Sequence, residues 1–174
     1  MKQHNKETVK GPEHLDAVGR ALGRIPSGLF VVAARNPETG ADQTMLASWV
    51  QQCSFDPPRL SIALAKGRGL GSLLETGADF TVSILPDGRK DLLARFGKPS
   101  ETPFEGTGHT RRGLAGAATI DEACAWFLCR SAGFQGAGDH DLLIADILDG
   151  ERGPEVDGQA PKPFVHLRSS GLRY

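Results

Sequence analysis

Glycine and proline are the residues that most constrain how this chain folds. The sequence contains 22 glycines and 11 prolines in 174 residues. Both residue types interrupt helices and strands and favour turns. The elements between them must therefore be short and numerous, which argues against a bundle of long helices.

The hydrophobic spacing within these short segments indicates mostly strands. Residues 60–65 and 80–85 alternate two kinds of side chain, which is the period of a strand. Residues 13–25 repeat apolar side chains every three or four positions, which predicts a helix that ends before Pro26. Further strands are predicted at 28–35, 44–55, 123–131, 141–148 and 163–168, short helices at 70–75 and 90–96, a turn at 133–138 and a loop at 98–112.

The order of these elements favours an antiparallel barrel with peripheral helices. The strands mostly follow one another without long helices between them, and residues 28–55 have the pattern of a hairpin. The length is that of one domain, so residues 12–174 are expected to form a single domain. Residues 1–11 are polar and are expected to be a flexible tail.

The charge and cysteine content exclude several classes of protein. Lys and Arg number 20 against 21 Asp and Glu, so the basic excess of a nucleic-acid binder is missing. No apolar run approaches the roughly 20 residues of a membrane span, and residues 1–11 lack the apolar segment of a signal peptide. Cys53, Cys124 and Cys129 are interpreted as small buried hydrophobic residues of a reduced, cytoplasmic protein, with a catalytic thiol as the alternative.

Sequence motifs for common catalytic sites are missing. The chain contains no GxSxG, HExxH or Walker sequence, and no GxGxxG follows a predicted strand. Its five histidines are scattered, and no pair has the spacing of metal ligands. The sequence therefore predicts no metal site.

Three segments carry candidate binding chemistry. Residues 66–69 (Lys-Gly-Arg-Gly) combine two cations with glycines that let backbone amides approach an anion, and Ser72 adds a hydroxyl. Residues 44–48 offer hydroxyl and backbone groups to a flat polar heterocycle. Residues 138–141 (Gly-Asp-His-Asp) place a histidine where it can bond or protonate a ligand. Their structural alternatives are a solvated basic turn, an ordinary strand and a turn stabilised by its own aspartate.

Four segments in this order resemble the flavin reductase family, the FMN-binding split-barrel proteins. They are residues 26–32, 44–65, 80–96 and 138–148, and the resemblance extends over residues 15–174. Residues 47–52 (Ala-Ser-Trp-Val-Gln-Gln) are similar to the flavin reductase modules attached to some diiron flavoproteins. The resemblance implies a mainly β fold: a six-stranded antiparallel split β-barrel of Greek-key type with short peripheral helices. It also implies a homodimer with FMN near the subunit interface.

The resemblance further implies a set of site residues. One strand would line the isoalloxazine, the turn at 65–68 would hold the ribityl and phosphate end, and a histidine would act near the nicotinamide or the flavin. Trp49 stands where relatives often carry Ser or Thr, and Ser83 where many carry Asn. The implied cofactor-binding residues are Thr44, Met45, Leu46, Ala47, Ser48, Trp49, Ala65, Lys66, Gly67, Arg68, Ser83, Phe96 and Tyr174, and the implied catalytic residue is His140.

The activity implied by the resemblance is that of an NAD(P)H-dependent flavin reductase. Hydride would pass from the nicotinamide of NADH or NADPH to N5 of FMN, or alternatively of FAD. Reduced flavin would then reach an electron-accepting protein or a monooxygenase partner, or be reoxidised. The alternatives are a pyridoxamine-phosphate-oxidase-like enzyme, with Arg111 and Arg112 at a second phosphate, a non-enzymatic flavin or haem carrier, and a barrel without ligand.

Overall fold

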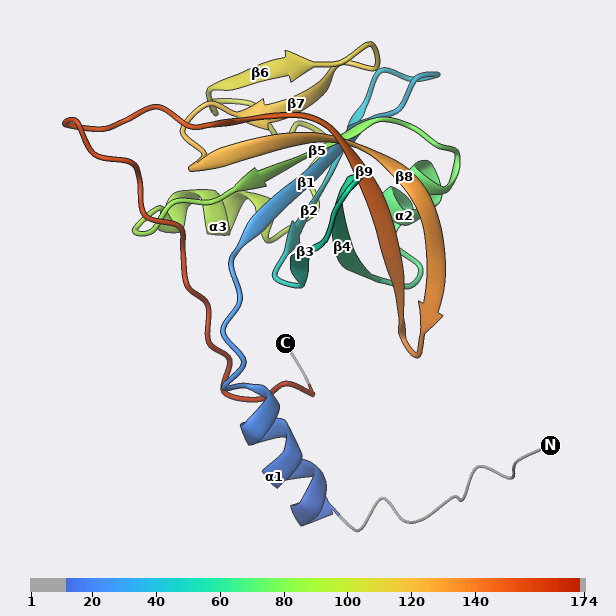
Figure 1. Ribbon diagram of the computed structural model, residues 1–174, viewed down its shortest axis with the longest axis vertical. Helices are drawn as coiled ribbons and strands as arrows, with labels where there is room; N and C mark the ends of the chain where they lie inside the picture. Colours follow the sequence, from blue (N-terminus) through green and yellow to red (C-terminus); the bar gives the residue numbers. More distant parts are fainter. Residues whose placement is uncertain (1–11, 173–174) are drawn as a thin grey trace. The chain divides into compact units, whose positions relative to one another are not determined.

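The computed structural model describes residues 12–172, and its main feature is one antiparallel sheet (Figure 1). Seven strands form this sheet in the order β2-β1-β5-β8-β9-β4-β3, and β6 and β7 form a separate pair. The strands are β1 (Phe30–Arg35), β2 (Asp42–Ala47), β3 (Val50–Phe55), β4 (Pro58–Ala65), β5 (Phe80–Ile84), β6 (His109–Arg112), β7 (Ala117–Ile120), β8 (Ala125–Ala137) and β9 (His140–Arg152). The helices are α1 (Pro12–Leu22), α2 (Gly69–Glu75) and α3 (Lys90–Phe96).

The main sheet is curled, because its two edge strands are neighbours in the chain. β2 lies at one edge and β3 at the other, and only Ser48 and Trp49 join them. A linker of this length reaches only about 10 Å, so the two edges must approach each other.

The prediction of a mainly β, antiparallel fold with short helices is confirmed. The prediction of six strands is wrong, because the main sheet has seven strands. The predicted barrel is not closed, because the edge strands β2 and β3 do not pair with each other.

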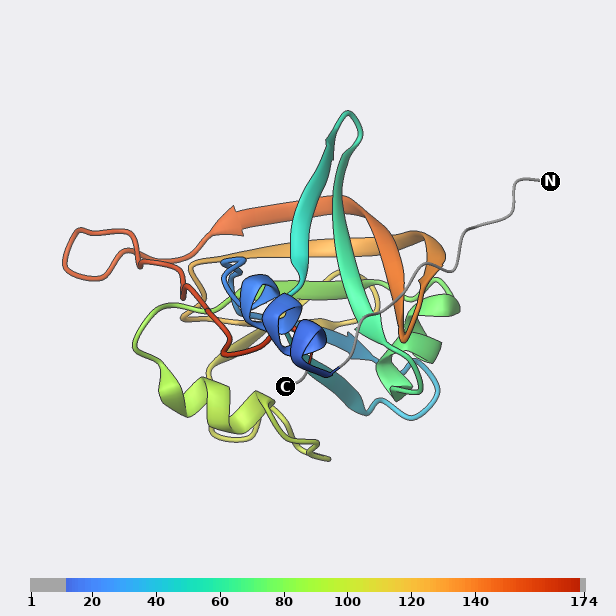
Figure 2. The same ribbon diagram turned by 90° about the horizontal axis from the view of Figure 1, so that it is seen from below.

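The predicted strand at 44–55 divides into β2 and β3. β2 forms the expected hairpin with β1, in which Phe30 lies opposite Ala47. At the division the carbonyl of Trp49 accepts a hydrogen bond from the backbone N–H of Ala63 (3.0 Å), so the chain leaves β1 and turns to β4. Figure 2 shows the resulting β3–β4 hairpin projecting from the rest of the sheet. Phe55, at its tip, is 90% exposed.

The strands β8 and β9 are longer than the sequence pattern predicts. Each has 13 residues, and the two pair along most of their length with register shifts at Leu128/Cys129 and Ser131/Gly133. Residues 133–137 belong to β8, so the turn predicted at 133–138 is wrong, and the chain reverses between Ala137 and His140 instead. Gly133 lies at the register shift that follows Ser131, so this glycine marks a bulge within a strand and not a turn.

The segments around 98–120 and 163–168 also differ from the prediction. The expected loop at 98–112 ends in β6, which pairs with β7. The expected strand at 163–168 forms only isolated bridges, of Pro163 with Pro86 and of His166 with Ser27. Proline has no N–H to donate, which limits a ladder at this position.

Two hydrophobic cores lie on the two faces of the sheet. β1 alternates between them: Val32 and Ala34 belong to the first core, and Val31 and Ala33 to the second. The first core includes α2, whose buried residues are Leu70, Leu73 and Leu74. The second core lies under α3 and β7 and includes Leu92, Phe96, Ala118 and Ile120.

The three cysteines occupy different environments. Cys129 is buried in the first core, whereas Cys124 is half-buried. Cys53 is exposed on the edge strand β3. The interpretation of all three cysteines as buried hydrophobic residues is therefore wrong for Cys53.

The chain divides into two compact units, namely residues 28–165 and a smaller unit with segments on both sides of them. In the smaller unit, Ser27 and His166 exchange two backbone hydrogen bonds (3.1 and 2.7 Å). α1 lies in the same unit and leaves its apolar residues Leu15, Val18 and Leu22 more than a third exposed. Folding of residues 12–174 as a single domain stays a prediction.

Among residues 12–172, no helix is long and apolar enough to cross a membrane.

Candidate functional site

The turn that follows β4 lies beside the turn that joins β8 to β9. Ala65 and His140 are register partners at the ends of β4 and β9. The next residue, Lys66, donates its backbone N–H to the carbonyl of Asp139 (3.1 Å) and its Nζ to the carbonyl of Gly138 (2.8 Å). Its Nζ also lies 3.7 Å from Oδ1 of Asp141. Two of the segments singled out in the sequence therefore meet at one end of the sheet.

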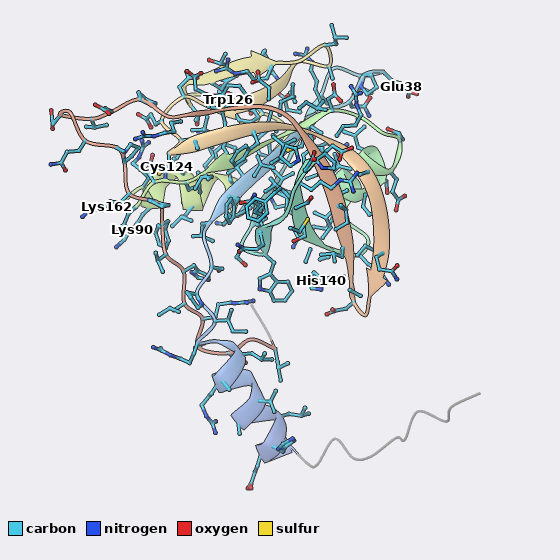
Figure 3. All side chains as sticks on the ribbon, viewed as in Figure 1. Glu38, Lys90, Cys124, Trp126, His140 and Lys162 are labelled. Carbon is cyan, nitrogen blue, oxygen red and sulfur yellow. The ribbon has the colours of Figure 1, made fainter. Side chains whose placement is uncertain are left out.

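His140 is buried at this end of the sheet, where its contacts include Trp49 and Asp139. Figure 3 shows it at the start of β9, away from Cys124, which precedes β8, and from Trp126, which lies near the start of β8. Its ring centroid lies 5.0 Å from that of Trp49, with the planes inclined by 52°. Its Nδ1 lies 2.8 Å from Oδ1 of Asp139, and this contact lowers the pKa of the Asp139 carboxyl. The expected residues Trp49, Lys66 and His140 thus form one cluster.

A small cavity lies beside Lys66 and the first turn of α2. Its volume is about 50 Å³, well below the roughly 300 Å³ of the smallest usual ligand pockets. Gly67 and Gly71 have open space where a Cβ atom would stand, and Gly67 has a positive φ of 79°. The polar and aromatic side chains that line the cavity are those of Lys66, Arg68, Ser72, Glu75, Phe134 and Asp141.

Arg68 and Gln43 have unused hydrogen-bonding groups near this cavity. Within residues 12–172 the Arg68 guanidinium forms no hydrogen bond or ion pair, in contrast to the ammonium group of Lys66. Oε1 of Gln43 is buried without a hydrogen-bond partner in the described part of the chain, and it would lie 3.5 Å from a Cβ atom on Gly69. A buried acceptor without a partner is costly in a folded protein, so a donor from outside residues 12–172 is expected there.

The strand β2 presents its predicted site residues to different faces of the sheet. Met45 and Ala47 are buried in the first core, on the side of α2. Leu46 packs against the second core, and Thr44 alternates with Met45 and is half-buried. Ser48 is half-buried in the linker to β3. Because β2 is an edge strand, one side of its backbone has no strand beside it in the sheet.

The structure keeps two of the expected residues apart from the cluster around His140. Ser83 is 1% exposed, and its Oγ accepts a hydrogen bond from the backbone N–H of Ile120 (3.1 Å) beneath β7. Phe96 is 3% exposed in the second core, where its ring centroid lies 5.4 Å from that of Phe104. Tyr174 lies outside the described residues.

The sequence reasoning missed two residues that belong to this site. Asp141 approaches Lys66, and Gln43 lies two positions before Met45 on the same face of β2. The strand period predicts the facing of Gln43, but nothing in the sequence predicts that α2 lies over that face. Among residues 12–172, no group of three or more metal-ligating side chains is found.

The arginines of the pyridoxamine-phosphate-oxidase-like alternative have partners within the chain. Arg111 forms a bidentate ion pair with Asp42, which raises the pKa of the Arg111 guanidinium. The guanidinium carbon of Arg112 lies 4.0 Å from the ring centroid of Trp126. These contacts hold the β6–β7 pair on the sheet and do not favour a second phosphate site.

Solved structures with this fold include flavin reductases. The styrene monooxygenase flavin reductase of Pseudomonas putida has a TM-score of 0.72 and 28% identity, over 85% of this chain and 91% of that chain. An NADH:FAD oxidoreductase of Streptomyces globisporus has a TM-score of 0.76 over 85% of both chains. Its identity of 23% supports similarity of fold alone.

Curated relatives align with nearly the whole chain. Diflavin flavoprotein A 1 of Synechocystis sp. is 33% identical over 172 residues, which are 95% of this chain and 29% of the relative. A diflavin flavoprotein A of Nostoc sp. is 36% identical over 162 residues, which are 90% of this chain and 27% of the relative. This chain therefore spans less than a third of the length of these relatives.

A family profile covers most of the sequence. It is described as the flavin reductase like domain, and it matches residues 22–171. This match includes both turns that meet at Lys66 and His140. The fold, the curated relatives and this profile agree, and the chain belongs to the flavin reductase like domain family.

Proposed function

We propose that this protein is an NAD(P)H-dependent flavin reductase that uses FMN, with FAD as the alternative. The observation that carries the proposal is the meeting of Trp49, His140 and the 65–68 turn at one end of the sheet. An aromatic ring, a buried histidine and an arginine without a partner among residues 12–172 are suited to a planar ring, a nicotinamide and a phosphate respectively. Family membership supports the flavin as the cofactor.

The residues near the cavity fit the phosphate end of such a cofactor. Arg68 offers charged donors that have no partner in the described part of the chain, and Gly67 and Gly71 leave space for a close approach. The cavity of about 50 Å³ is too small for an isoalloxazine, so the ring would lie outside it. The edge backbone of β2 and the hydroxyls of Thr44 and Ser48 would orient that ring.

The protein's part in the reaction is binding and orientation. When bound, the flavin supplies the hydride acceptor at N5. Trp49 would limit the space beside the ring, and His140 would position the nicotinamide so that its C4 approaches N5. Reduced flavin would then pass to a monooxygenase or another electron-accepting protein, or be reoxidised.

The test is the visible absorption spectrum of the purified protein during titration with FMN and then NADH or NADPH. We expect flavin bands that bleach when the nicotinamide is added. A protein that binds neither FMN nor riboflavin would contradict the proposal, and one that binds FMN without oxidising either nicotinamide would be a carrier.

The Arg68→Ala variant tests the phosphate assignment. Losing a charge-assisted hydrogen bond is expected to weaken FMN binding by about 1.5–3 kcal/mol. Riboflavin lacks the phosphate, so its affinity is expected to stay unchanged, and an equal loss for both ligands would contradict the assignment.

A further inference from the structure

We propose that Lys66 is a positioning residue for His140 and not a phosphate ligand. The inference rests on the proposed function, because it assigns His140 to the nicotinamide. Lys66 and Arg68 are two positions apart, yet their side chains have different surroundings. The Lys66 ammonium is bonded to the β8–β9 turn, whereas the Arg68 guanidinium has no partner within residues 12–172.

Lys66 contacts three positions that flank His140 in the chain, namely Gly138, Asp139 and Asp141. Its backbone N–H donates to the carbonyl of Asp139 (3.1 Å), and its Nζ donates to the carbonyl of Gly138 (2.8 Å). Oδ1 of Asp141, on the other side of His140, lies 3.7 Å from the same Nζ. The main-chain bond would survive any substitution except proline, so the side chain adds the ties to Gly138 and Asp141.

The β8–β9 turn needs these ties because little else packs against it. Residues 135–139 are exposed, and Gly138 has a positive φ of 74° that only glycine adopts readily. His140 itself is buried, with 8% of its surface exposed. Lys66 therefore connects an exposed, weakly packed turn to the end of β4, next to the buried ring.

The ring of His140 is held in one orientation by Asp139 and Trp49. Nδ1 lies 2.8 Å from the Asp139 carboxylate, which only accepts hydrogen bonds when ionised, so Nδ1 is the donor. The carboxylate of Asp139 is ionised near neutral pH, and its pKa is lowered further by His140 first and by Lys66 to a smaller extent. In the neutral ring Nε2 is then the acceptor. Without the Lys66 side chain the turn keeps its main-chain bond at Asp139 but loses the bond at Gly138. The Asp139 side chain is then held less firmly, and this tautomer loses support.

Nitrogen NMR of the histidine rings tests the proposal without flavin or nicotinamide present. In 15N-histidine-labelled protein, the His140 signals, assigned with His140→Gln, are expected to show the Nδ1–H tautomer. Lys66→Ala is expected to shift them toward an averaged imidazole. Lys66→Arg retains a donor and is expected to restore them, and Lys90→Ala removes an exposed lysine elsewhere and is expected to change nothing. Unchanged His140 signals in Lys66→Ala would overturn the proposal.

Kinetics and flavin titration separate the two roles of the 65–68 turn. Lys66→Ala is expected to raise the KM for NADH by about 10-fold, the size of one charged hydrogen bond, and to leave the ratio of FMN to riboflavin affinity unchanged. Arg68→Ala is expected to lower that ratio and leave the His140 signals in place. FMN-selective weakening in Lys66→Ala would overturn the proposal and make Lys66 a phosphate ligand. Failure of the proposed function would appear separately, as wild-type protein that does not oxidise NADH with FMN.

Discussion

At the scale of single residues, exposure sets the reactivity of the three cysteines. Burial raises the pKa of the Cys129 thiol to about 12, and it also raises that of the half-buried Cys124. The thiolate is the reactive form, so Cys129 is protonated and unreactive at pH 8. Cys53 is exposed on an edge strand.

We therefore expect iodoacetamide at pH 8 to label Cys53 first and Cys129 only after unfolding. Peptide mass spectrometry at successive times measures the order of labelling. Labelling in denaturant is the control, since all three thiols are then exposed. Equal rates for Cys53 and Cys129 in the folded protein would contradict the burial of Cys129.

At the scale of elements, two buried hydroxyl groups join the main sheet to β7. Oγ1 of Thr81 donates to the carbonyl of Ala118 (2.5 Å), and Oγ of Ser83 accepts from the N–H of Ile120 (3.1 Å). Thr81 and Ser83 are 0% and 1% exposed. The hydroxyl of Ser83, which the resemblance assigned to the flavin, is therefore used to hold β7 in the folded chain.

Thr81→Val is expected to lower the free energy of unfolding by about 1–3 kcal/mol, because the buried carbonyl of Ala118 loses its side-chain donor. Urea unfolding measures the change. Thr110→Val is the matched control, because it removes an exposed hydrogen bond, from Oγ1 of Thr110 to Oδ1 of Asp121 (2.7 Å), and is expected to change stability by less than about 0.5 kcal/mol. A similar stability for both variants would show that the Thr81 bond adds nothing.

The sequence predicts elements well where their periodicity is clear and their ends are marked. The helix at 90–96 was predicted with its exact bounds, and Phe80, Val82 and Leu143 lie in strands and in the core. The pattern fails where glycine lies inside a strand, as at Gly133 and Gly136 in β8. It also fails at β6, whose polar residues carry no apolar alternation because the strand is mostly exposed.

The candidate site was predictable by segment and less so by side chain. The segments at 65–68 and 138–141 contain glycines and charged residues that are unusual inside a strand, so the sequence singles them out. The structure brings these two segments together. Phe96 shows the limit: an aromatic residue on a short helix looks the same whether it faces a ligand or a core, and here it packs on Phe104. Lys66 and not Arg68 is bonded within residues 12–172 because of Gly138, which lies 72 positions later, so local sequence pattern cannot predict this difference.

At the scale of the whole molecule, we expect a homodimer, as the family resemblance implies. The cavity beside Lys66 is too small for a flavin ring, and Phe55, the last residue of the edge strand β3, is 90% exposed. Light scattering coupled to size-exclusion chromatography is expected to give twice the 18.5 kDa of one chain. A mass of one chain across a wide range of concentrations would contradict the dimer.

The pairing of Ser27 with His166 has a consequence for protein engineering. Because these two residues exchange backbone hydrogen bonds, the polypeptide enters and leaves residues 28–165 at one point. A segment whose ends are adjacent can interrupt a surface loop of a host protein without pulling the loop open. Residues 27–166 thus have the geometry of an insertable cassette, which makes them suited to fusions in which a host domain reports on the binding of the inserted one.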